Sequence, residues 1–467
     1  MFRLLFILSV AVWLSACNTI IQQHVVLHPS LPVPGSRHVA VFLDGTANDS
    51  ASRTNVIRLF EIMSNQDRAD VASFYNEGVG TGARLIGAVT GAGIATDIEE
   101  AYDYLLREYA AAKDPSYIHL HFFGFSRGAF TARALAGLVW TAGIPMLHDT
   151  TSDYWRRQLV YEVYKAYHYM PGTEAERKAH VQAVYNSDKW KGRIKRVVRD
   201  IPIDTLGLWD TVESLGLRGL GEAVLNDNRH YADQLCNVKR VLHAMSLEDN
   251  RAEAFAPLLL NLPQRWADCP QQRDKTVLHE VWFAGAHADV GGGYDDDGGL
   301  SGVSLNWMLQ HLAQPFEPGG RGLVAPGTRV WEDTLAIAHD AQGSNFLYRA
   351  ILAREHRPLH RYLCKMNGGR PLKAPGLCSV PVVRPLQLHD SVRLRRKDCA
   401  KNAQPREASQ VARNTWQFPM QDRSSRQRDC NFNSGWFEQY PFAGCVPEDG
   451  QTAEVPARCA QVIQWVR

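Results

Sequence analysis

Ser126 stands between two glycines in the run Gly124-Phe125-Ser126-Arg127-Gly128. An aromatic stretch that favours a strand precedes this run, and a stretch rich in Ala and Gly that favours a helix follows it. A serine on a sharp strand-to-helix turn needs small flanking residues, because the backbone passes closely on both sides. The spacing therefore predicts that Ser126 is a nucleophile. It also predicts that the Arg127 amide, at the helix N-terminus, stabilises an oxyanion.

A nucleophilic serine needs a histidine as general base and a carboxylate that orients this histidine. Asp210 follows one predicted strand and His287 follows another, in the chain order serine, acid, histidine. His389, in the segment LQLHDSVRLRR, is a rival base because a final strand and its histidine loop could fall there. The sequence therefore predicts Asp210 as the acid and leaves the base open between His287 and His389.

A second oxyanion donor is expected in a loop that follows an early strand. The segment VAVFLDGTAND supplies Gly45 and Thr46 at this place. Gly45 permits a close backbone approach that a side chain would block. Asp44 either fixes this loop through hydrogen bonds to nearby amides or belongs to a plain Asp-Gly turn.

Other acidic and glycine-rich segments are weaker candidates for ligand binding. Asp289 is either a structural acid beneath the site or, with Asp295 to Asp297, a cation ligand, although EF-hand spacing is missing. The loop from Gly78 to Gly82 lacks the third glycine of a dinucleotide fingerprint and the Lys-Ser/Thr of a phosphate loop, so we interpret it as a rim of the site. The sequence has no Cys-x-x-Cys pair, the close spacing that is typical of zinc ligands. We therefore expect no metal and no cofactor.

These residues need a sheet to position them, and short β-branched and aromatic runs do alternate with helix-like segments. Strands are expected at His38 to Leu43, Tyr117 to Phe123, Asp204 to Trp209 and Leu278 to Ala284. A capping-box pattern from Thr96 to Glu99 predicts a helix start, and residues 150–200 resemble helical cap material. The predicted fold is α/β: an α/β-hydrolase-like, mostly parallel sheet with helices on both faces, a helical cap insertion and a Cys-rich C-terminal extension.

The N-terminal segment has the features of a secretory signal. One positive charge at Arg3 precedes an apolar run from Leu4 to Trp13, which is shorter than the about 20 apolar residues of a transmembrane helix. Cys17 follows the small residues Ser15 and Ala16 directly, as in a bacterial lipoprotein signal. The alternative is an ordinary cleaved signal with an incidental cysteine.

The lipoprotein interpretation divides the start of the chain into a signal peptide at 1–16 and a lipidated tether at 17–36 that begins with acylated Cys17. Asn18 follows this cysteine, and the absence of Asp there favours the outer membrane. We therefore expect an exported protein that is anchored in the bacterial cell envelope by lipid.

The cysteines also favour export. Of the nine cysteines, Cys17 is assigned to lipidation, which leaves an even number for disulfides in an oxidising compartment. Six of these follow residue 360, where apolar periodicity is weak. We expect a catalytic domain at 37–320 and a C-terminal extension at 321–467 that disulfides hold together and that packs on the catalytic domain.

Composition limits the classes of partner. With 467 residues, 45% of them hydrophobic, the chain can bury a large core. The formal net charge of +2 is too small to suggest nucleic acid as a partner. The oligomeric state is left open by the sequence.

The chain resembles the α/β-hydrolases that include the first class of type VI secretion lipase effectors, also called domain of unknown function 2235. The matching blocks are FLDGTAND, RTNVIRLFE, YNEGVGTG, FGFSRGAFTARALAG, LGLWDTVESLG, HAMSLEDNRAEAFAP, WFAGAHADVGGGY followed by GLSGVSLNWM, and LHDSVRLR, in order from residue 41 to about residue 396.

The resemblance implies hydrolysis of acyl esters, with glycerophospholipids as the best-known substrates, through a Ser-Asp-His triad without a metal. It implies that Ser126 is the nucleophile and Asp210 the acid, while His287 and His389 both lie in family motifs. The lipoprotein signal and the cysteine-bearing tail depart from the effectors, which are delivered into other cells. These departures leave the target of the enzyme open.

We therefore expect a serine hydrolase of the phospholipase type that works at a membrane through its anchor at Cys17. A first alternative is a surface lipoprotein that uses a hydrolase fold as a binding module, with the basic stretch Arg393 to Arg428 touching phosphate headgroups or a partner. A second alternative is the hydrolysis of a non-lipid ester or thioester.

Overall fold

A computed structural model describes residues 24–26, 36–45, 52–66, 68–78, 92–168, 173–212, 235–251, 255–262, 266, 269–294, 298–315, 320–339, 341, 357–367, 384–395, 442, 445 and 457–467. The signal segment, Cys17, Thr46, Asp295 to Asp297 and most of the stretch from Arg393 to Arg428 lie outside these residues. Within the described part of the chain, no helix is long and apolar enough to cross a membrane.

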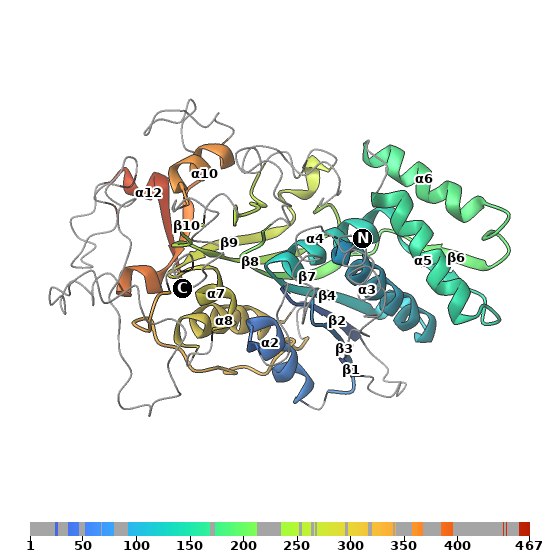
Figure 1. Ribbon diagram of the computed structural model, residues 1–467, viewed down its shortest axis with the longest axis horizontal. Helices are drawn as coiled ribbons and strands as arrows, with labels where there is room; N and C mark the ends of the chain where they lie inside the picture. Colours follow the sequence, from blue (N-terminus) through green and yellow to red (C-terminus); the bar gives the residue numbers. More distant parts are fainter. Residues whose placement is uncertain are drawn as a thin grey trace, which may run out of the picture.

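A nine-stranded sheet runs through the centre of the molecule, in the order β1-β3-β2-β4-β7-β8-β9-β10-β11 (Figure 1). The strands are β1 (His24–Val26), β2 (Arg37–Leu43), β3 (Val71–Asn76), β4 (Ile118–Phe125), β7 (Ile203–Trp209), β8 (Arg240–Ser246), β9 (Val277–Phe283), β10 (Leu386–His389) and β11 (Ile463–Val466). Only β1 is antiparallel to its neighbour. The sheet confirms the expected mostly parallel α/β fold.

Helices cover both faces of this sheet (Figure 1). They are α2 (Asn55–Ser64), α3 (Ala92–Ala111), α4 (Arg127–Ala142), α5 (Asp153–His168), α6 (Glu174–Asn186), α7 (His287–Gly291) and α8 (Gly299–Leu312). Alternate side chains of β2 point to opposite faces, as a strand requires. Val39 and Val41 join a core with α3, α4 and α5, whereas Ala40 and Phe42 join a second core with α2 and α8.

The chain after α4 forms the helical insertion that the sequence predicts for residues 150–200. Helices α5 and α6 pack on each other and on α3 and α4. β5 (Ile144–Leu147) precedes these two helices in the chain and β6 (Ile194–Val198) follows them, and the two strands pair as a separate antiparallel sheet. Tyr185 donates from its hydroxyl to the Ala142 carbonyl at 3.1 Å, which joins the end of α6 to the end of α4. The insertion therefore extends the helical layer on the α4 face.

The four strands expected from the sequence are confirmed, and no end differs by more than two residues. The expected helix start at Thr96 is wrong, because α3 begins four residues earlier, at Ala92. The earlier turn is stabilised by Ile94, which is buried in the core, and Asp97 lies inside the helix with 5% of its surface exposed. Strands β3 and β8 were not expected.

The C-terminal part of the chain adds strands to the same sheet. β10 pairs in parallel with β9, and β11 pairs in parallel with β10. A third core lies beneath α10 (Leu359–Met366) and α12 (Cys459–Val462), where Leu363 and Leu388 pack with Trp282 of β9. The extension thus shares a sheet and a core with the strands that precede it.

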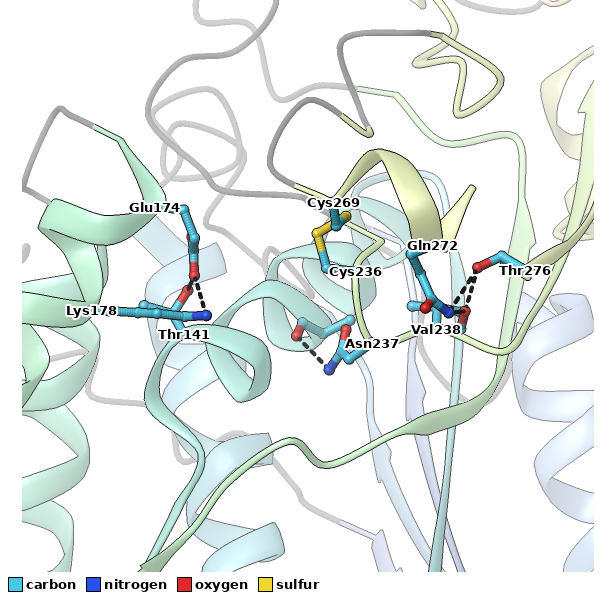
Figure 2. Close-up of a disulfide and its surroundings, with 10 residues drawn as sticks. Thr141, Glu174, Lys178, Cys236, Asn237, Val238, Cys269, Gln272 and Thr276 are labelled. Carbon is cyan, nitrogen blue, oxygen red and sulfur yellow. Dashed lines mark hydrogen bonds and ion pairs between the residues drawn. A yellow bond between two sulfur atoms is a disulfide. The ribbon is translucent and has the colours of Figure 1, made fainter. Parts of the chain in front are cut away.

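Disulfides are present, as the cysteine count predicts. Cys236 pairs with Cys269 and Cys445 pairs with Cys459, and Cys364 is also disulfide-bonded. Figure 2 shows the first pair, which joins the segment before β8 to the segment before β9. Beside it, the Thr276 hydroxyl donates to the Val238 carbonyl at 2.7 Å. This cross-link fixes the starts of two strands that end at the candidate site.

Candidate active site

The serine turn has the sharp geometry that its glycines predict. Ser126 has a φ of 59°, in the left-handed region, and lies between β4 and α4. A Cβ atom on Gly124 would lie 2.4 Å from the Gly128 carbonyl oxygen, and one on Gly128 would lie 2.1 Å from the Leu43 carbonyl oxygen. Both distances are far shorter than a van der Waals contact. Only glycine therefore fits at either position, and the start of α4 packs directly on the end of β2.

His287 contacts both Ser126 and Asp210. Its Nε2 lies 2.8 Å from the Ser126 Oγ, and its Nδ1 lies 2.5 Å from the Asp210 Oδ2. Asp210 follows β7, which pairs with the serine strand β4, and His287 follows β9. All three side chains thus meet at the carboxyl ends of parallel strands, where open α/β sheets bind ligands.

Several contacts fix the orientation of the His287 imidazole. The Phe125 ring lies 4.6 Å from it and the Phe255 ring lies 5.0 Å from it, measured between ring centroids. The His287 backbone amide donates to the Asp249 Oδ2 at 3.2 Å, and the Arg251 guanidinium donates to the same oxygen at 2.6 Å. The histidine is therefore held at its ring and at its backbone.

Asp210 is completely buried and remains the charged partner in this site. The Ser246 amide donates to its Oδ1 at 2.9 Å, and Arg357 donates to both of its carboxylate oxygens, at 2.6 and 2.9 Å. Burial alone would raise the pKa of Asp210, but the Arg357 charge and the His287 contact outweigh burial and lower this pKa to about 2. Asp210 is therefore ionised at neutral pH.

Burial lowers the pKa of His287 below its usual value of 6.5, although the adjacent Asp210 opposes this effect. At neutral pH the imidazole is therefore uncharged. With a proton on the Nδ1 that faces Asp210, the Nε2 lone pair faces the Ser126 hydroxyl. This arrangement can accept the serine proton when Oγ attacks an electrophile.

His389, the rival base, lies in a different environment at the end of β10. Its Nδ1 contacts the Ser391 hydroxyl at 2.8 Å, and its ring stacks on Phe283 at 4.6 Å. Burial lowers its pKa to about 4. Of the two candidate histidines, only His287 has a hydrogen bond to Ser126 in the described part of the chain. The hydrogen bond to Ser126 thus distinguishes His287 from His389, which the sequence alone does not do.

The expected oxyanion donors receive uneven support from the geometry. Arg127 is the first residue of α4, so its amide lies next to Ser126 at a helix N-terminus. The Gly45 amide instead donates to the Asp44 Oδ1 at 2.7 Å. Asp44 also accepts from Thr54 and Tyr75, at 2.5 and 2.9 Å, so this aspartate joins the end of β2 to the N-cap of α2 and to β3. A role for Gly45 would require its amide to be shared between Asp44 and the oxyanion.

Asp289 has the contacts of a structural acid. Its Oδ2 accepts from the backbone amides of Ala286 and His339, at 2.8 and 2.9 Å, and its Oδ1 lies 2.6 Å from the His339 Nδ1. These contacts join the start of α7, which carries His287, to a segment more than fifty residues later in the chain. Asp289 therefore ties α7, the helix that begins with His287, to the segment around His339.

Sequence reasoning missed Asp249, Ser246 and Arg357, which form hydrogen bonds with His287 or Asp210. Ser246 is the last residue of β8, and Asp249 follows that strand. Both lie in the block HAMSLEDNRAEAFAP, and this family motif was the signal by which they could have been found. Arg357 gave no such signal, because it stands in the arginine-rich segment REHRPLHRYL far from every recognised block.

This chain aligns with only part of each of the following related proteins. An uncharacterised protein of Saccharomyces cerevisiae is 24% identical in an alignment of 260 residues that covers 50% of this chain and 34% of the yeast protein. An uncharacterised protein from Pseudomonas aeruginosa has a structure that is 19% identical, with a TM-score of 0.32 over 62% of this chain and 47% of that one. This chain thus spans about a third of the yeast protein and about half of the bacterial one.

A second similar structure is the Tle1 effector bound to the VgrG spike from the type VI secretion system, at 17% identity and a TM-score of 0.28, over 60% of this chain and 58% of that one. The family model of the Tle1-like phospholipase effector catalytic domain of type VI secretion matches residues 37–311, which is more than half of the sequence and includes Ser126, Asp210 and His287. The chain therefore belongs to the family of Tle1-like phospholipase effectors of type VI secretion, through their catalytic domain.

Proposed function

We propose that this protein is a serine hydrolase that cleaves acyl esters of glycerophospholipids, with Ser126 as nucleophile, His287 as general base and Asp210 as the orienting acid. The observation that carries the proposal is the continuous chain of contacts from the Ser126 Oγ through both nitrogens of His287 to Asp210. Family membership supports the lipid ester as substrate, since the family is described by its phospholipase effectors.

The geometry supports a two-step acyl transfer. In the first step the Ser126 Oγ attacks the ester carbonyl carbon while the His287 Nε2 takes the hydroxyl proton. The carbonyl oxygen becomes an oxyanion that the Arg127 amide stabilises at the helix N-terminus. The tetrahedral intermediate then collapses, the alcohol leaves as His287 returns the proton to its oxygen, and an acyl-Ser126 ester remains.

Water completes the reaction in the second step. His287 removes a proton from a water molecule, whose oxygen attacks the acyl carbon. The second tetrahedral intermediate releases the fatty acid, and the proton on His287 returns to the Ser126 Oγ. Throughout the cycle Asp210 stays ionised, stabilises the imidazolium that forms in each step, and holds Nδ1 in a fixed orientation.

Purified protein and phospholipid vesicles provide the test. Wild-type protein should release fatty acid from phosphatidylcholine and phosphatidylethanolamine, and Ser126→Ala should abolish this release. Ser116→Ala, at an exposed serine of a short 3₁₀ helix (Pro115–Tyr117), is the matched control and should retain full activity. Activity retained in Ser126→Ala would contradict the mechanism.

Parallel assays with short-chain esters and acyl thioesters separate the alternatives. A wild-type protein that cleaves only soluble esters or only thioesters would contradict the lipid substrate but keep the mechanism. A wild-type protein that hydrolyses nothing yet binds vesicles would favour a binding module on a hydrolase fold.

We also propose that lipidation at Cys17 anchors the enzyme in the bacterial envelope, on the basis of the sequence alone. Cells grown with an alkyne-tagged fatty acid should label the wild-type protein and should not label Cys17→Ser. Label that persists in Cys17→Ser would contradict the anchor without affecting the catalytic proposal.

A further inference from the structure

Arg357 makes the most extensive contact with the candidate acid. Its Nη1 donates to the Asp210 Oδ1 at 2.6 Å, and its Nη2 donates to the Asp210 Oδ2 at 2.9 Å. The two parallel bonds form the bidentate geometry in which arginine fixes the plane of a carboxylate. Because Oδ2 is also the oxygen that contacts the His287 Nδ1, this fork sets the direction from which Asp210 meets the histidine.

The fork is built into the core rather than placed on a surface. Arg357 is 1% exposed, and Asp210 is fully buried. The remaining Nη hydrogens of Arg357 donate to the carbonyl oxygens of Ser246 and Phe255, both at 2.7 Å. Ser246 itself donates its amide to Asp210, and Phe255 packs against the His287 ring. Arg357 thus connects Asp210 with Ser246, which also contacts Asp210, and with Phe255, which contacts His287.

Arg357 comes from the C-terminal part of the chain. The family model ends at residue 311, and Arg357 lies just before Pro358, the N-cap residue of α10. This helix lies near β9 and β10 (Figure 1). Its residues Leu359 and Leu363 are buried, and the ring of Tyr362 stacks on that of Trp282 with 5.9 Å between ring centroids. The extension therefore anchors the guanidinium by ordinary core packing.

We propose that Arg357 is a positioning residue for the hydrolase, by which the C-terminal extension completes the catalytic site: it holds Asp210 oriented toward His287 and balances the charge of the carboxylate. This inference rests on the proposed function. It predicts that the extension is needed for full activity, and not only for folding, because it supplies one half of a charge pair within the site.

The charged groups around Asp210 define the expected pH effect. His287 faces it from α7, Arg357 faces it from the extension, and Asp249 and Arg251 lie beyond them in the segment after β8. Without the guanidinium, the full negative charge of Asp210 acts on the imidazole and favours its protonated form. Burial would also raise the pKa of an Asp210 that has lost its cation. Both effects move the acidic limb of the activity profile to higher pH.

The test compares Arg357→Gln and Arg357→Lys with wild type in kcat and KM from pH 5 to pH 9. Arg357→Gln should shift the acidic limb of kcat/KM upward by about one pH unit, as expected for the loss of a near charge. Arg357→Lys keeps the charge and loses the fork, so the limb should stay near its wild-type position while kcat falls roughly 10-fold. KM should change little in both variants, because the hydrogen bonds of Arg357 go to Asp210 and to the carbonyl oxygens of Ser246 and Phe255.

Arg395→Gln is the matched control. Arg395 is an equally buried arginine of the extension that donates to the Thr334 and Ala336 carbonyl oxygens, away from Asp210. It should lower thermal stability without moving the acidic limb. An unmoved limb in a folded Arg357→Gln protein would overturn the proposal.

A double-mutant cycle gives an independent outcome if Arg357→Gln does not fold. In an Asp210→Asn background, Arg357→Lys should have little further effect on kcat, since the residue acts through the carboxylate. Losses that simply multiply would overturn the proposal. Ester hydrolysis by wild type and by Ser126→Ala is measured alongside. If wild type is active and Ser126→Ala is not, a negative result for Arg357 leaves the proposed function standing.

Discussion

The His287 Nε2 lies 2.8 Å from the Ser126 Oγ, although the two residues are 161 positions apart in the chain. Ser126 immediately follows β4, and His287 begins the short helix α7 that follows β9 of the same sheet, so the sheet itself brings them together. The second ring nitrogen faces a carboxylate whose oxygens are held by Ser246 and Arg357. Substitutions of these residues and their neighbours are therefore expected to have distinct consequences.

The two candidate bases should differ sharply in their effect on rate. His287→Ala removes the proton acceptor beside Ser126 and should reduce kcat on a phospholipid or short-chain ester on the order of 10⁴-fold or more. His389→Ala removes a ring that stacks on Phe283 and contacts Ser391, so kcat should stay within a few-fold of wild type. Equal losses in the two variants, with both folded by circular dichroism, would contradict His287 as the base.

The acidic limb of kcat/KM should report the ionisation of His287 in the free enzyme. The base acts in its neutral form, and burial lowers the pKa of His287 below 6.5 in spite of Asp210. The midpoint of the acidic limb should therefore lie below pH 6.5. A steady-state profile in non-interacting buffers measures this, and a limb centred above pH 7 would be inconsistent with a neutral, buried base.

Gly128→Ala should be severe because its methyl group meets backbone atoms rather than a flexible side chain. The added Cβ would lie 2.1 Å from the Leu43 carbonyl oxygen and 2.4 Å from the Asp44 carbonyl oxygen. Overpacking of this kind costs typically 1–3 kcal/mol or more, and here it also displaces Ser126. Thermal unfolding and activity check this, with Gly192→Ala as the control, since nothing lies within 4 Å of its added Cβ. Wild-type activity in Gly128→Ala would refute the close approach.

Buried histidines on the neighbouring strands β2 and β4 should make the fold sensitive to acid. Burial lowers the pKa of His38 from 6.5 to about 4, and its Nδ1 lies 3.0 Å from the Nε2 of buried His121. Because the unfolded chain takes up the proton first, stability is complete above about pH 6.5 and is lost as the pH falls toward 4. The loss attributable to His38 should approach roughly 3 kcal/mol.

Denaturant unfolding of wild type and His38→Gln at pH 7.5 and pH 4.5 measures this loss. The glutamine variant should lose less stability between the two pH values than wild type does. His148→Gln, at an exposed histidine, should behave as wild type. An identical pH dependence in His38→Gln and wild type would show that His38 is not a source of acid sensitivity.

Local patterns explain why much of the central fold could be predicted. The strands that carry Ser126, Asp210 and His287 are short apolar runs, each followed by a polar or small residue, and this local signal needs no tertiary information. Strand β8 (Arg240–Ser246) was missed, although buried residues fill it, because His243 interrupts its apolar pattern. The structure explains this residue: the His243 ring lies 3.1 Å from the buried Glu280 carboxylate.

Contacts between distant segments set the limit of sequence reasoning at the site. His287 follows β9 and His389 is the last residue of β10, and only the strand order, with β10 beyond β9 in the sheet, separates their positions. Arg357 could not have been found, because its partner Asp210 is 147 positions away and nothing in its own segment marks it. Gly45 was chosen for its backbone freedom, but the hydrogen bond from its amide to Asp44 depends on a side-chain rotamer.

A serine that is activated by His287 should react covalently with a fluorophosphonate, and this reaction tests the central claim most directly. Intact-mass spectrometry should show one adduct on the wild-type protein, and peptide mapping should place it on Ser126. Ser126→Ala should remain unmodified, and His287→Ala should react slower by on the order of 10³-fold or more. An unmodified wild-type protein, or an adduct that persists in Ser126→Ala, would contradict the account.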